Sequence, residues 1–414
     1  MRIAVVGSGI SGLTAAWLLQ RHHQVALFEA EARPGGHTHT HSVRVEGRGI
    51  RVDTGFIVYN DRNYPWFTRL LTELGVAGRP TEMSFSVVNE ATGLEYNGRD
   101  LDALFAQRRN LLSPSFWGML REILRFNREA PKVLGLQGTG PTLGRFLADN
   151  RYGEAFARDY LVPMGAAIWS VPTDRMMDFP AARVVEFFRN HGLLSIADRP
   201  QWFVVQGGSS TYVERILAAL GSDQLRLCTP VRSIERGAEG VTLVTDSERS
   251  HFDAVVMACH SDQALALLSD ASAEEREILG AIGYQPNDVL LHTDPSVLPD
   301  RRKAWASWNY RLPREGAAGV TVSYWMNHLQ HIDVETPLIV TLNQDARIDE
   351  RRVLARERYA HPVFDGPALL AQARRAEING VRHSWYCGAY WRYGFHEDGC
   401  LSAVEVAADL GVQW

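Results

Sequence analysis

The sequence predicts an α/β protein built around a Rossmann-like nucleotide-binding domain, and features of its first thirty or so residues carry the prediction. An apolar run, Ile3–Val6, leads directly into the glycine-rich turn Gly7-Ser8-Gly9-Ile10-Ser11-Gly12. A helical stretch, Leu13–Arg21, and a second strand, Gln24–Phe28, follow the turn. An acid, Glu29, closes that strand about 20 positions after the turn, the spacing typical of a dinucleotide site.

Each part of this fingerprint has a physical role. The glycines permit a tight turn, a close approach of the backbone to a diphosphate, and close packing of helix on strand. The helix directs its amino-terminal N–H groups at the phosphates. Glu29 is placed to bind the adenosine ribose, and no basic residue directly follows it, which argues against a 2′-phosphate. A second glycine doublet, Gly35-Gly36, comes soon after, and a plain NAD domain has no need of it.

Histidines at every second position follow the Gly35-Gly36 doublet. His37, His39 and His41 are spaced at period two, which places them on one face of a predicted strand. Three histidines on one face are compatible with a metal site, but no cysteine or carboxylate cluster accompanies them in the sequence, so we predict no metal. Arg51–Val58 then predicts a strand and turn, and Tyr64–Leu74 predicts an amphipathic helix ending at Gly75.

The middle of the chain predicts an inserted α+β substrate domain. Strand-like segments, Phe85–Asn89 and Leu94–Asn97, come before three helical stretches rich in apolar residues, namely Leu101–Gln107, Phe116–Phe126 and Tyr152–Leu161. The segment Ser115–Phe126 carries aromatic residues beside two arginines, so it is also a candidate for contact with a membrane surface. We expect it to form an inner face of the substrate domain instead.

The chain then returns to the cofactor domain. The expected elements are a return at Phe203–Gly208, a helix at Ser210–Leu220, and strands at Leu225–Arg236, Gly240–Val244 and Phe252–Ala258. A second excursion supplies strands at Val289–Thr293, Val320–Trp325 and Leu338–Leu342, and the last piece runs from Trp385–Ala389 into a helix at Cys400–Leu410. We therefore predict a discontinuous cofactor domain of residues 1–75, 201–265 and 376–414, and a substrate domain of residues 76–200 and 266–375.

Composition is ordinary for a soluble globular protein of 414 residues. The hydrophobic content is 45%, the charged content 22% and the net charge −5, so nothing indicates nucleic-acid binding. The four cysteines form no CxxC pair, which favours free thiols in a reducing cytoplasm. The chain opens directly on the first strand and has no run of about 20 apolar residues, so we expect neither a signal peptide nor a membrane span. A cytoplasmic protein is expected, at most peripheral to the inner face of a membrane.

The fingerprint and the second doublet resemble those of the FAD-dependent amine oxidase and phytoene desaturase superfamily, and the resemblance extends over nearly the whole chain. Within it, the chain resembles a bacterial group of predicted NAD/FAD-binding oxidoreductases through Leu161–Ser170, Asn190–Leu194 and Tyr393–Gly399. The resemblance implies a GR2-type, amine-oxidase-like FAD-binding domain carrying an inserted α+β domain. It also implies an FAD-dependent oxidoreductase whose FAD is held non-covalently, since no cysteine stands where a thioether attachment is expected.

The resemblance also implies roles for individual residues. The residues expected to bind FAD are Gly7, Gly9, Ser11 and Gly12 around the diphosphate, Glu29 and Ala30 at the ribose, Arg33, Gly35, Gly36 and His37 in the phosphate cradle, Val231 at the adenine, and Thr54, Gly55, Phe56, Gly388, Phe395 and His396 around the isoalloxazine. The helix after His396 would direct its positive end at the flavin N1–O2 edge. His396 is the candidate catalytic residue, orienting substrate or stabilising charge; alternatively it only packs at the start of that helix.

The departures from the superfamily concern the substrate. Many amine oxidases place a lysine near flavin N5, whereas the matching stretch here, Tyr284–Leu290, has none, and Lys303 is expected at the surface. The carboxy-terminal member of the aromatic pair that flanks an amine would be Phe395 or His396. Many aromatic residues favour a bulky apolar substrate, namely Phe85, Phe105, Phe116, Trp117, Phe126, Trp169, Phe187, Phe188, Trp305, Trp308 and Trp325.

The leading hypothesis is hydride transfer from a C–H of an apolar substrate to flavin N5, with dehydrogenation of a fatty acyl chain as the reaction, because the resemblance links this group to acyl-chain modification. The alternatives are a flavin amine oxidase acting on a small or polyamine-type substrate, a flavin-dependent isomerase, and a non-catalytic lipid carrier. With a single nucleotide fingerprint, reoxidation is expected to use oxygen, a quinone or an electron carrier.

Overall fold

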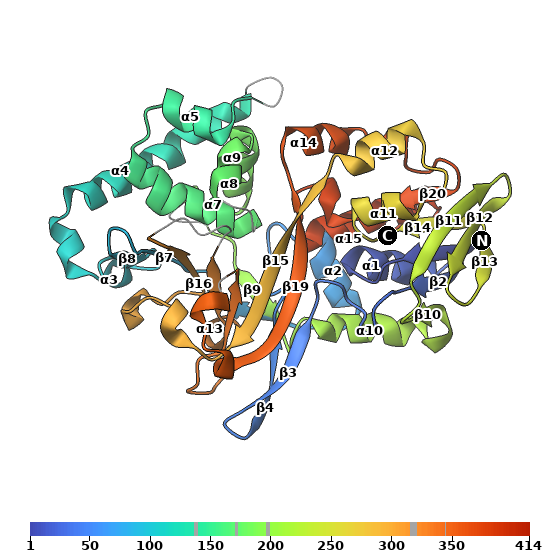
Figure 1. Cartoon of the computed structure of the whole chain (residues 1–414), viewed down its shortest axis with the longest axis horizontal. Helices are drawn as coiled ribbons and strands as arrows, with labels where there is room; N and C mark the ends of the chain where they lie inside the picture. The colour runs from blue at the N-terminus through green and yellow to red at the C-terminus, as the bar shows by residue number, and fades with distance from the viewer. Residues whose placement is uncertain (136–139, 170–172, 196–198, 315–320, 344) are drawn as a thin grey trace.

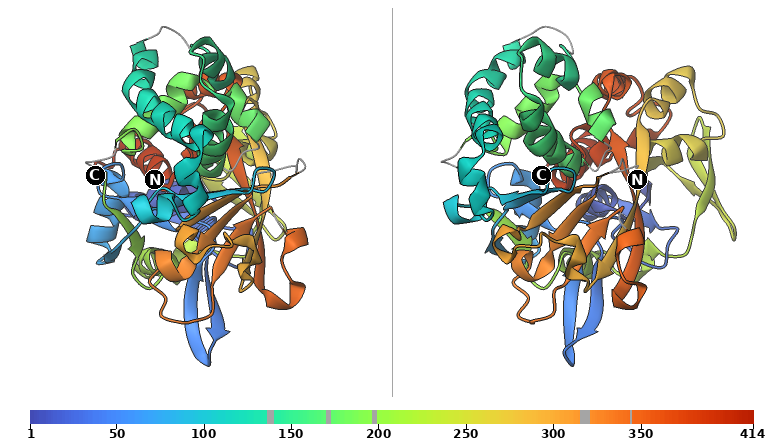
Figure 2. Two further views of the ribbon diagram at one scale, coloured as in Figure 1. Left: turned by 90° about the vertical axis from the view of Figure 1, so that its left-hand side faces the viewer. Right: turned by 60° about the vertical axis from the view of Figure 1, so that its left-hand side comes forward.

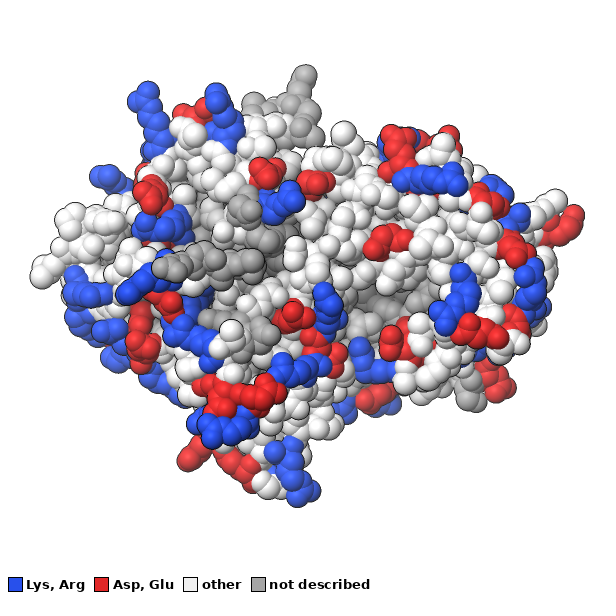
Figure 3. Space-filling view, in the orientation of Figure 1, with Lys and Arg blue, Asp and Glu red and all other residues white. Residues whose placement is uncertain are grey.

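The computed structural model describes residues 1–135, 140–169, 173–195, 199–314, 321–343 and 345–414. They form two bodies, and the long strands β15 (Gly283–His292) and β19 (Val353–Val363) stand between them (Figure 1). The described helices include none that is both long and apolar enough to traverse a lipid bilayer. Basic and acidic side chains are interspersed on the face shown in Figure 3, with no broad field of one sign.

The first body contains a five-stranded parallel sheet in the order β10-β2-β1-β14-β20. Its strands are β1 (Arg2–Val6), β2 (Gln24–Phe28), β10 (Leu225–Arg226), β14 (Ala254–Met257) and β20 (Ser384–Tyr386). Helix α1 (Ile10–Leu19) is buried at every residue and packs against α10 (Ser210–Leu220) and α15 (His396–Asp409). The predicted α/β class and Rossmann-like sheet are confirmed.

Parts of the second excursion pack with this first body. The antiparallel sheet of β11 (Val231–Gly237), β12 (Gly240–Thr245) and β13 (Arg249–Phe252) shares a hydrophobic cluster with α11 (Ser261–Leu267), α12 (Ala273–Gly280) and α14 (Gly366–Ala373). Ile278 and Ala368 of these helices lie in the same cluster as Met257 and Tyr386 of the parallel sheet. The sequence assigned α12 and α14 to the substrate domain, because helical periodicity does not show which body a helix packs against.

The second body is a seven-stranded sheet in the order β19-β15-β18-β17-β16-β7-β8. Its remaining strands are β7 (Phe85–Asn89), β8 (Leu94–Asn97), β16 (Trp308–Leu312), β17 (Val322–Trp325) and β18 (Ile339–Leu342). All neighbouring strands are antiparallel except β7 and β16, which pair in parallel and join the two excursions. The predicted strand at Val320–Trp325 begins at Val322, and its first residue lies outside the described residues.

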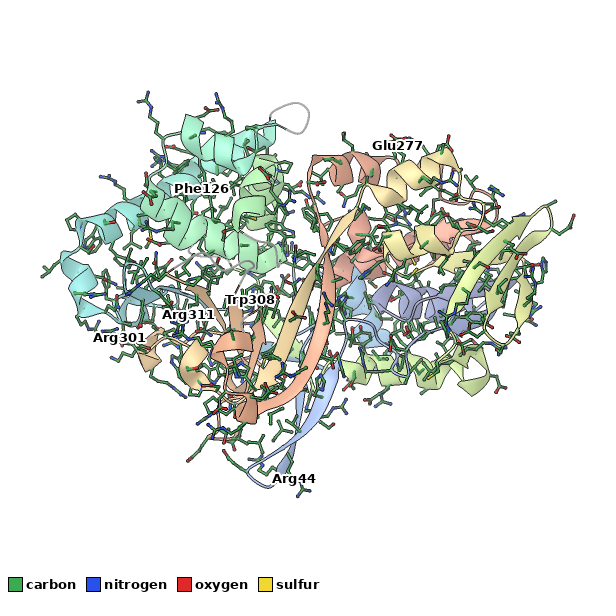
Figure 4. All side chains as sticks on the ribbon, viewed as in Figure 1. Arg44, Phe126, Glu277, Arg301, Trp308 and Arg311 are labelled. Carbon is green, nitrogen blue, oxygen red and sulfur yellow. The ribbon has the colours of Figure 1, made fainter. Side chains whose placement is uncertain are left out.

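Helices cover one side of this sheet (Figures 1 and 2). They are α3 (Leu101–Leu104), α4 (Pro114–Glu129), α5 (Leu143–Asp149), α6 (Glu154–Phe156), a π-helical turn at Ala157–Leu161, α7 (Val162–Trp169), α8 (Thr173–Asp178) and α9 (Ala181–Asn190). Helix α4 turns Phe116, Met119 and Phe126 inward, as expected for an inner face, while Trp117 and Leu124 stay about half exposed (Phe126 is labelled in Figure 4). The helix expected at Leu101–Gln107 ends at Leu104.

Smaller elements join the bodies. A three-stranded sheet pairs β9 (Trp202–Val205) with β5 (Val58–Asn60) and β6 (Gly78–Thr81). The hairpin of β3 (Thr40–Val45) and β4 (Arg48–Asp53) projects from the molecule in every view (Figure 2). Two short helices, α2 (Pro65–Glu73) and α13 (Met326–Leu329), complete the frame around the site.

Two predicted boundaries were wrong for local reasons. The last helix begins at His396 rather than Cys400, because the Asp398 carboxylate accepts the N–H of Phe395 (2.9 Å) and so supports an earlier first turn. The strand expected at Leu225–Arg236 is split into β10 and β11. Cys228 has φ +49° and Pro230 lacks an N–H, so neither suits a continuous strand.

Candidate cofactor and substrate site

A cavity of about 1790 Å³ runs from the turn after β1 to the side chains of the second body. Most small-molecule pockets have about 300–1,000 Å³, so this one has room for more than a single small ligand. Most of the residues predicted to bind FAD line it, namely Gly7, Gly9, Ser11, Glu29, Ala30, Arg33, Gly35, Gly36, His37, Gly55, Phe56, Val231, Gly388, Phe395 and His396.

Gly12 and Thr54, the other two predicted residues, do not line the cavity. A methyl group on Gly12 would overlap the carbonyl oxygen of Gly7, so Gly12 is needed for close packing of α1 on the turn. The buried Thr54 hydroxyl hydrogen-bonds the Tyr359 hydroxyl (3.0 Å). These two residues therefore support the lining without forming it, and their contact with the cofactor stays a prediction.

The end of the cavity at α1 fits a diphosphate. Helix α1 begins after Gly9, no side chain caps its amino terminus, and a Cβ on Gly9 would meet nothing within 4 Å. Gly7 adopts φ +101° and Gly35 φ +116°, both in the region that favours glycine. The Gly35 N–H donates to the carbonyl of Ser8 (3.0 Å), so the second doublet is tied to the first turn. An uncapped helix start bordered by bare backbone is an anion site.

Glu29 is held in place at the ribose end. Its carboxylate accepts the Ser8 N–H (3.0 Å), the Ser8 hydroxyl (2.5 Å) and the Glu31 N–H (3.0 Å). Ser8 also accepts the Gly35 N–H on its Oγ (3.1 Å), so it joins both glycine motifs. The sequence analysis missed Ser8, because it occupies a variable position of the fingerprint and only the fold brings it to Glu29.

Arg33 braces the loop between the two motifs. Its guanidinium donates to the carbonyls of Thr38 (2.8 Å) and Gly36 (2.8 Å), and at longer range to that of Pro34 (3.3 Å). The side chain also lines the cavity. Arg33 therefore fixes the backbone of the second doublet and adds positive charge beside it.

His396 sits at the start of α15 among polar and aromatic partners. Its ring stacks on Phe56 with centroids 3.5 Å apart and planes 11° apart. Its Nε2 hydrogen-bonds the hydroxyls of Thr38 (3.0 Å) and Tyr212 (3.1 Å). Burial lowers the pKa of His396 to about 3, so the ring stays neutral at physiological pH. This geometry favours packing at the helix start, the alternative that the sequence left open for His396.

Two acids follow His396 in the first turn of α15. The Glu397 carboxylate accepts the N–H groups of Trp66 (3.1 Å) and Phe67 (2.9 Å), and thereby caps α2. Asp398 accepts the N–H groups of Phe395 (2.9 Å) and Tyr393 (3.2 Å). Burial raises the pKa of Glu397 to about 7 and that of Asp398 to about 6. They orient the backbone at the cavity end of α15.

Aromatic and aliphatic side chains line the part of the cavity in the second body. Of the predicted aromatic set, Phe85, Phe187 and Trp308 line it (Trp308 is labelled in Figure 4). The other members lie in the core or at the surface, away from this lining. The sequence analysis missed further lining residues on β8, the π-helical turn, α7, β9 and β17, namely Tyr96, Tyr160, Met164, Ile168, Trp202 and Tyr324. No sequence pattern separates them from ordinary core residues.

Charged side chains are few at this end. Arg99, Arg199 and Glu82 line the cavity together with Glu357 and Arg358 of β19, and the arginines are exposed. No lysine lines it among the described residues. Lys303 is exposed and pairs with Asp102 (2.8 Å), as expected for a surface position. The described lining therefore offers no lysine to stand beside flavin N5.

Comparisons with known proteins agree with this geometry. The model of the family "Flavin containing amine oxidoreductase" matches residues 10–410. The Mycobacterium tuberculosis protein AofH, which bears the name of a flavin-containing monoamine oxidase, is 27% identical over 278 residues, covering 65% of this chain and 59% of AofH. The chain thus matches less than two thirds of the length of that relative.

Solved structures show the same fold across the whole chain. Putrescine oxidase bound to putrescine has a TM-score of 0.71 at 16% identity and covers all of both chains. A fatty acid isomerase of P. acnes that produces CLA has a TM-score of 0.69 at 18% identity and covers 99% of this chain and 98% of its own.

Proposed function

Because this chain belongs to the family of flavin-containing amine oxidoreductases and is an FAD-dependent oxidoreductase, we propose that it removes hydride from a C–H group of a fatty acyl chain. FAD supplies the hydride acceptor when it is bound. The protein's own contribution is to bind the cofactor at the glycine motifs, to exclude water, and to hold the chain against the cofactor. The substrate class is the proposal argued below.

The observation that carries the proposal is the chemistry of the cavity wall. The cavity wall in the second body includes Phe187, Ile168, Met164 and Trp308, which carry no ionisable groups. Burying apolar substrate surface against such a wall gains about 25 cal/mol per Å², so a long hydrocarbon binds well. The acids among the described lining residues of the second body are Glu82, which lies 3.5 Å from His328, and Glu357, which lies 3.3 Å from His39 and His41.

The arginines suggest how an acyl chain is oriented. Burial raises the pKa of the Tyr160 phenol to about 12. The guanidinium of Arg199 lies close enough to act in the opposite direction and lower that pKa, but its effect is the smaller one. Arg99 pairs with Asp100 (2.8 Å) and lies near Glu82. Both guanidinium groups are exposed and line the cavity. We propose that one of them binds the carboxylate or phosphate of the substrate headgroup, because arginine pairs bidentately with such anions.

Amine oxidation is the second candidate. Phe395 stacks on Phe187 (centroids 5.0 Å apart), and Phe187 stacks on His191 (3.7 Å). An aromatic stack beside the cofactor is a surface on which a small cation binds. The names of AofH and of putrescine oxidase favour this candidate. The described rings Phe395, Phe187 and His191 include no carboxylate that would pair with an ammonium ion, which counts against it.

Anaerobic mixing of the holoenzyme with each substrate class distinguishes the candidates. Long-chain fatty acids or their phospholipids are expected to bleach the yellow flavin absorbance, with a product two hydrogens lighter by mass spectrometry, while putrescine and cyclohexylamine leave it unchanged. Arg199→Gln is expected to raise KM for the free acid by about tenfold, the equivalent of one lost contact of 1.4 kcal/mol. Arg302→Gln is the matched control, because Arg302 lies over Trp305 outside the cavity lining.

Three results would overturn acyl dehydrogenation. Bleaching by amines alone would support the second candidate. A product of unchanged mass with a shifted double bond would indicate isomerisation, the activity named for the P. acnes neighbour. Purified protein that takes up no flavin would indicate the lipid carrier.

For an acyl substrate held in a membrane, we propose peripheral contact through the exposed apolar side chains of α3, α4 and the segment between them. Leu112 is 88% exposed, Leu101 75% and Trp117 49%. Arg108 and Arg121 are exposed in the same segment and suit anionic headgroups. Oxygen, a quinone or an electron carrier is proposed as the final acceptor.

A further inference from the structure

Two strand faces meet beside the cavity. His39 and His41 lie side by side, with ring centroids 3.9 Å apart, and β19 presents Glu357 and Tyr359 toward this segment from the second body. Strand β3 begins only at Thr40, so His37 and His39 precede it and the predicted common strand face of the three histidines is not formed. The His37 ring lies 5.0 Å from that of Tyr359, and the Tyr359 hydroxyl lies 3.4 Å from His39 Nδ1. Glu357 lies two positions before Tyr359 on β19. The fold therefore brings a carboxylate, distant in sequence, to His39 and His41.

The three side chains have the spacing of a metal ligand set. His39 Nδ1 and His41 Nε2 each lie 3.3 Å from Glu357 Oε1, and all three ligand atoms lie within 4.8 Å of one another. Ligands about 2.0–2.2 Å from a tetrahedral zinc ion are about 3.3–3.4 Å apart. The two measured separations therefore match edges of such a tetrahedron, with no large movement of the strands required.

The Tyr359 hydroxyl is within hydrogen-bond distance of His39 Nδ1 (3.4 Å), whereas His41 Nε2 has no such partner among the described residues. His41 Nε2 is buried, and no described residue completes a hydrogen bond with it. Its 3.3 Å approach to the Glu357 carboxylate is longer than a charge-assisted hydrogen bond of about 2.7–2.9 Å. A buried ring nitrogen without a partner costs free energy, and a bound cation would satisfy it together with the carboxylate.

We propose that His39, His41 and Glu357 bind one divalent transition-metal ion, for which Zn²⁺ is the best match. Two imidazoles and one carboxylate form a known zinc ligand set that leaves a fourth position open. His39 and Glu357 line the cavity, so the fourth position faces water or a cavity ligand. The ion joins the start of the β3–β4 hairpin to β19 of the second body. The sequence predicted no metal for want of a carboxylate, and the fold supplies Glu357.

Arg33 is the neighbouring positive charge that opposes a cation here. Its guanidinium lies close enough for its charge to act on both His39 and His41. Arg33 also lies in the loop that is expected to hold the FAD diphosphate, whose negative charges offset it. The metal-binding measurement therefore uses the FAD-loaded enzyme.

The test is a zinc titration of untagged holoenzyme, freed of metal by dialysis against chelating resin, in competition with a chromophoric chelator. One Zn²⁺ per chain is expected, and X-ray absorption is expected to show nitrogen and oxygen ligands at about 2.0–2.2 Å. His41→Ala is expected to weaken zinc binding by about tenfold or more, with FAD content unchanged because His41 does not line the cavity.

Glu357→Gln provides a second variant that preserves side-chain shape, and it is expected to weaken zinc binding similarly. His22→Ala is the control, because His22 is exposed and should leave the titration unchanged. The proposal is overturned by a wild-type enzyme that binds no zinc, or by equal affinity in wild type, His41→Ala and Glu357→Gln, which would indicate adventitious binding only.

Discussion

Gly9 and Gly12 belong to one motif but meet different surroundings. A Cβ on Gly9 would point into open space at the cavity, whereas a Cβ on Gly12 would overlap the carbonyl of Gly7. Gly9 has φ −66°, which any residue adopts. The two positions therefore separate the role of a glycine in ligand approach from its role in packing.

Alanine substitutions at these positions are expected to differ in kind. Gly9→Ala should change the free energy of unfolding of the apoprotein by less than about 0.5 kcal/mol, yet weaken FAD binding by about tenfold or more, the equivalent of at least 1.4 kcal/mol. Gly12→Ala should destabilise the apoprotein by about 1–3 kcal/mol through overpacking. Urea unfolding and titration with FAD measure both effects. Equal loss of stability in the two variants would contradict this assignment.

At the scale of elements, α15 organises the site by holding the start of α2. Glu397 caps α2 through Trp66 and Phe67, and the same turn of α15 presents His396 to the cavity. The hydrogen bonds of a buried carboxylate that caps a helix stabilise its charged form, whereas removal of the charge from water destabilises that form. Burial dominates here, because the pKa of Glu397 is raised from 4.5 to about 7.

The raised pKa predicts how stability depends on pH. Between about pH 4.5 and 7 the folded protein retains a proton on Glu397 that the unfolded chain releases, so stability falls as pH rises through this window. The loss attributable to this group is of order 3 kcal/mol. Glu397→Gln is expected to remove this part of the dependence, as measured by urea unfolding at several pH values.

The comparison between wild type and Glu397→Gln isolates this group. Asp53 also has a pKa raised to about 6 by burial, and its contribution cancels in the difference, whereas that of Asp398, likewise raised to about 6, is coupled to the charge of Glu397. Glu154→Gln is a control at an exposed position and should follow the wild-type curve. Parallel curves for wild type and Glu397→Gln would show that Glu397 does not titrate in this range.

At the scale of the whole molecule, the cavity depends on how the two bodies are held together. Gln330, just after α13, and Asp53, at the end of β4, form a reciprocal pair: Gln330 Nε2 donates to the carboxylate (2.7 Å) and the Asp53 N–H donates to Gln330 Oε1 (2.9 Å). Elsewhere, the Arg183 guanidinium of α9 lies over the Tyr393 ring (3.5 Å) and donates to the Arg392 carbonyl (2.7 Å). These contacts join the substrate side to the loops around the cofactor.

Gln330→Leu is expected to destabilise the protein by about 1–3 kcal/mol, because it leaves the buried Asp53 carboxylate with one donor fewer and its N–H without an acceptor. FAD binding should weaken as well, since Asp53 precedes the lining residues Gly55 and Phe56. Gln206→Leu, at an exposed position, is the control for unfolding and for FAD titration. Indistinguishable variants would show that the Gln330–Asp53 pair does not hold the two bodies together.

The sequence by itself determined the adjacent strands β1 and β2, the glycine turn, the acid at the end of β2 and the cofactor, because each depends on neighbours within about thirty residues. Local order also predicted α10 and the adjacency of His39 and His41. Only the tertiary structure decided that Ser8 orients Glu29, that Gly12 and Thr54 stand behind the lining, that α12 and α14 pack on the first body, and which aromatic residues line the cavity. Each of these depends on contacts between segments far apart in the chain, and an amphipathic pattern shows that a side chain is buried without showing what it is buried against. For the same reason, the carboxylate that completes the ligand set with His39 and His41 is found in the fold and not in the local sequence.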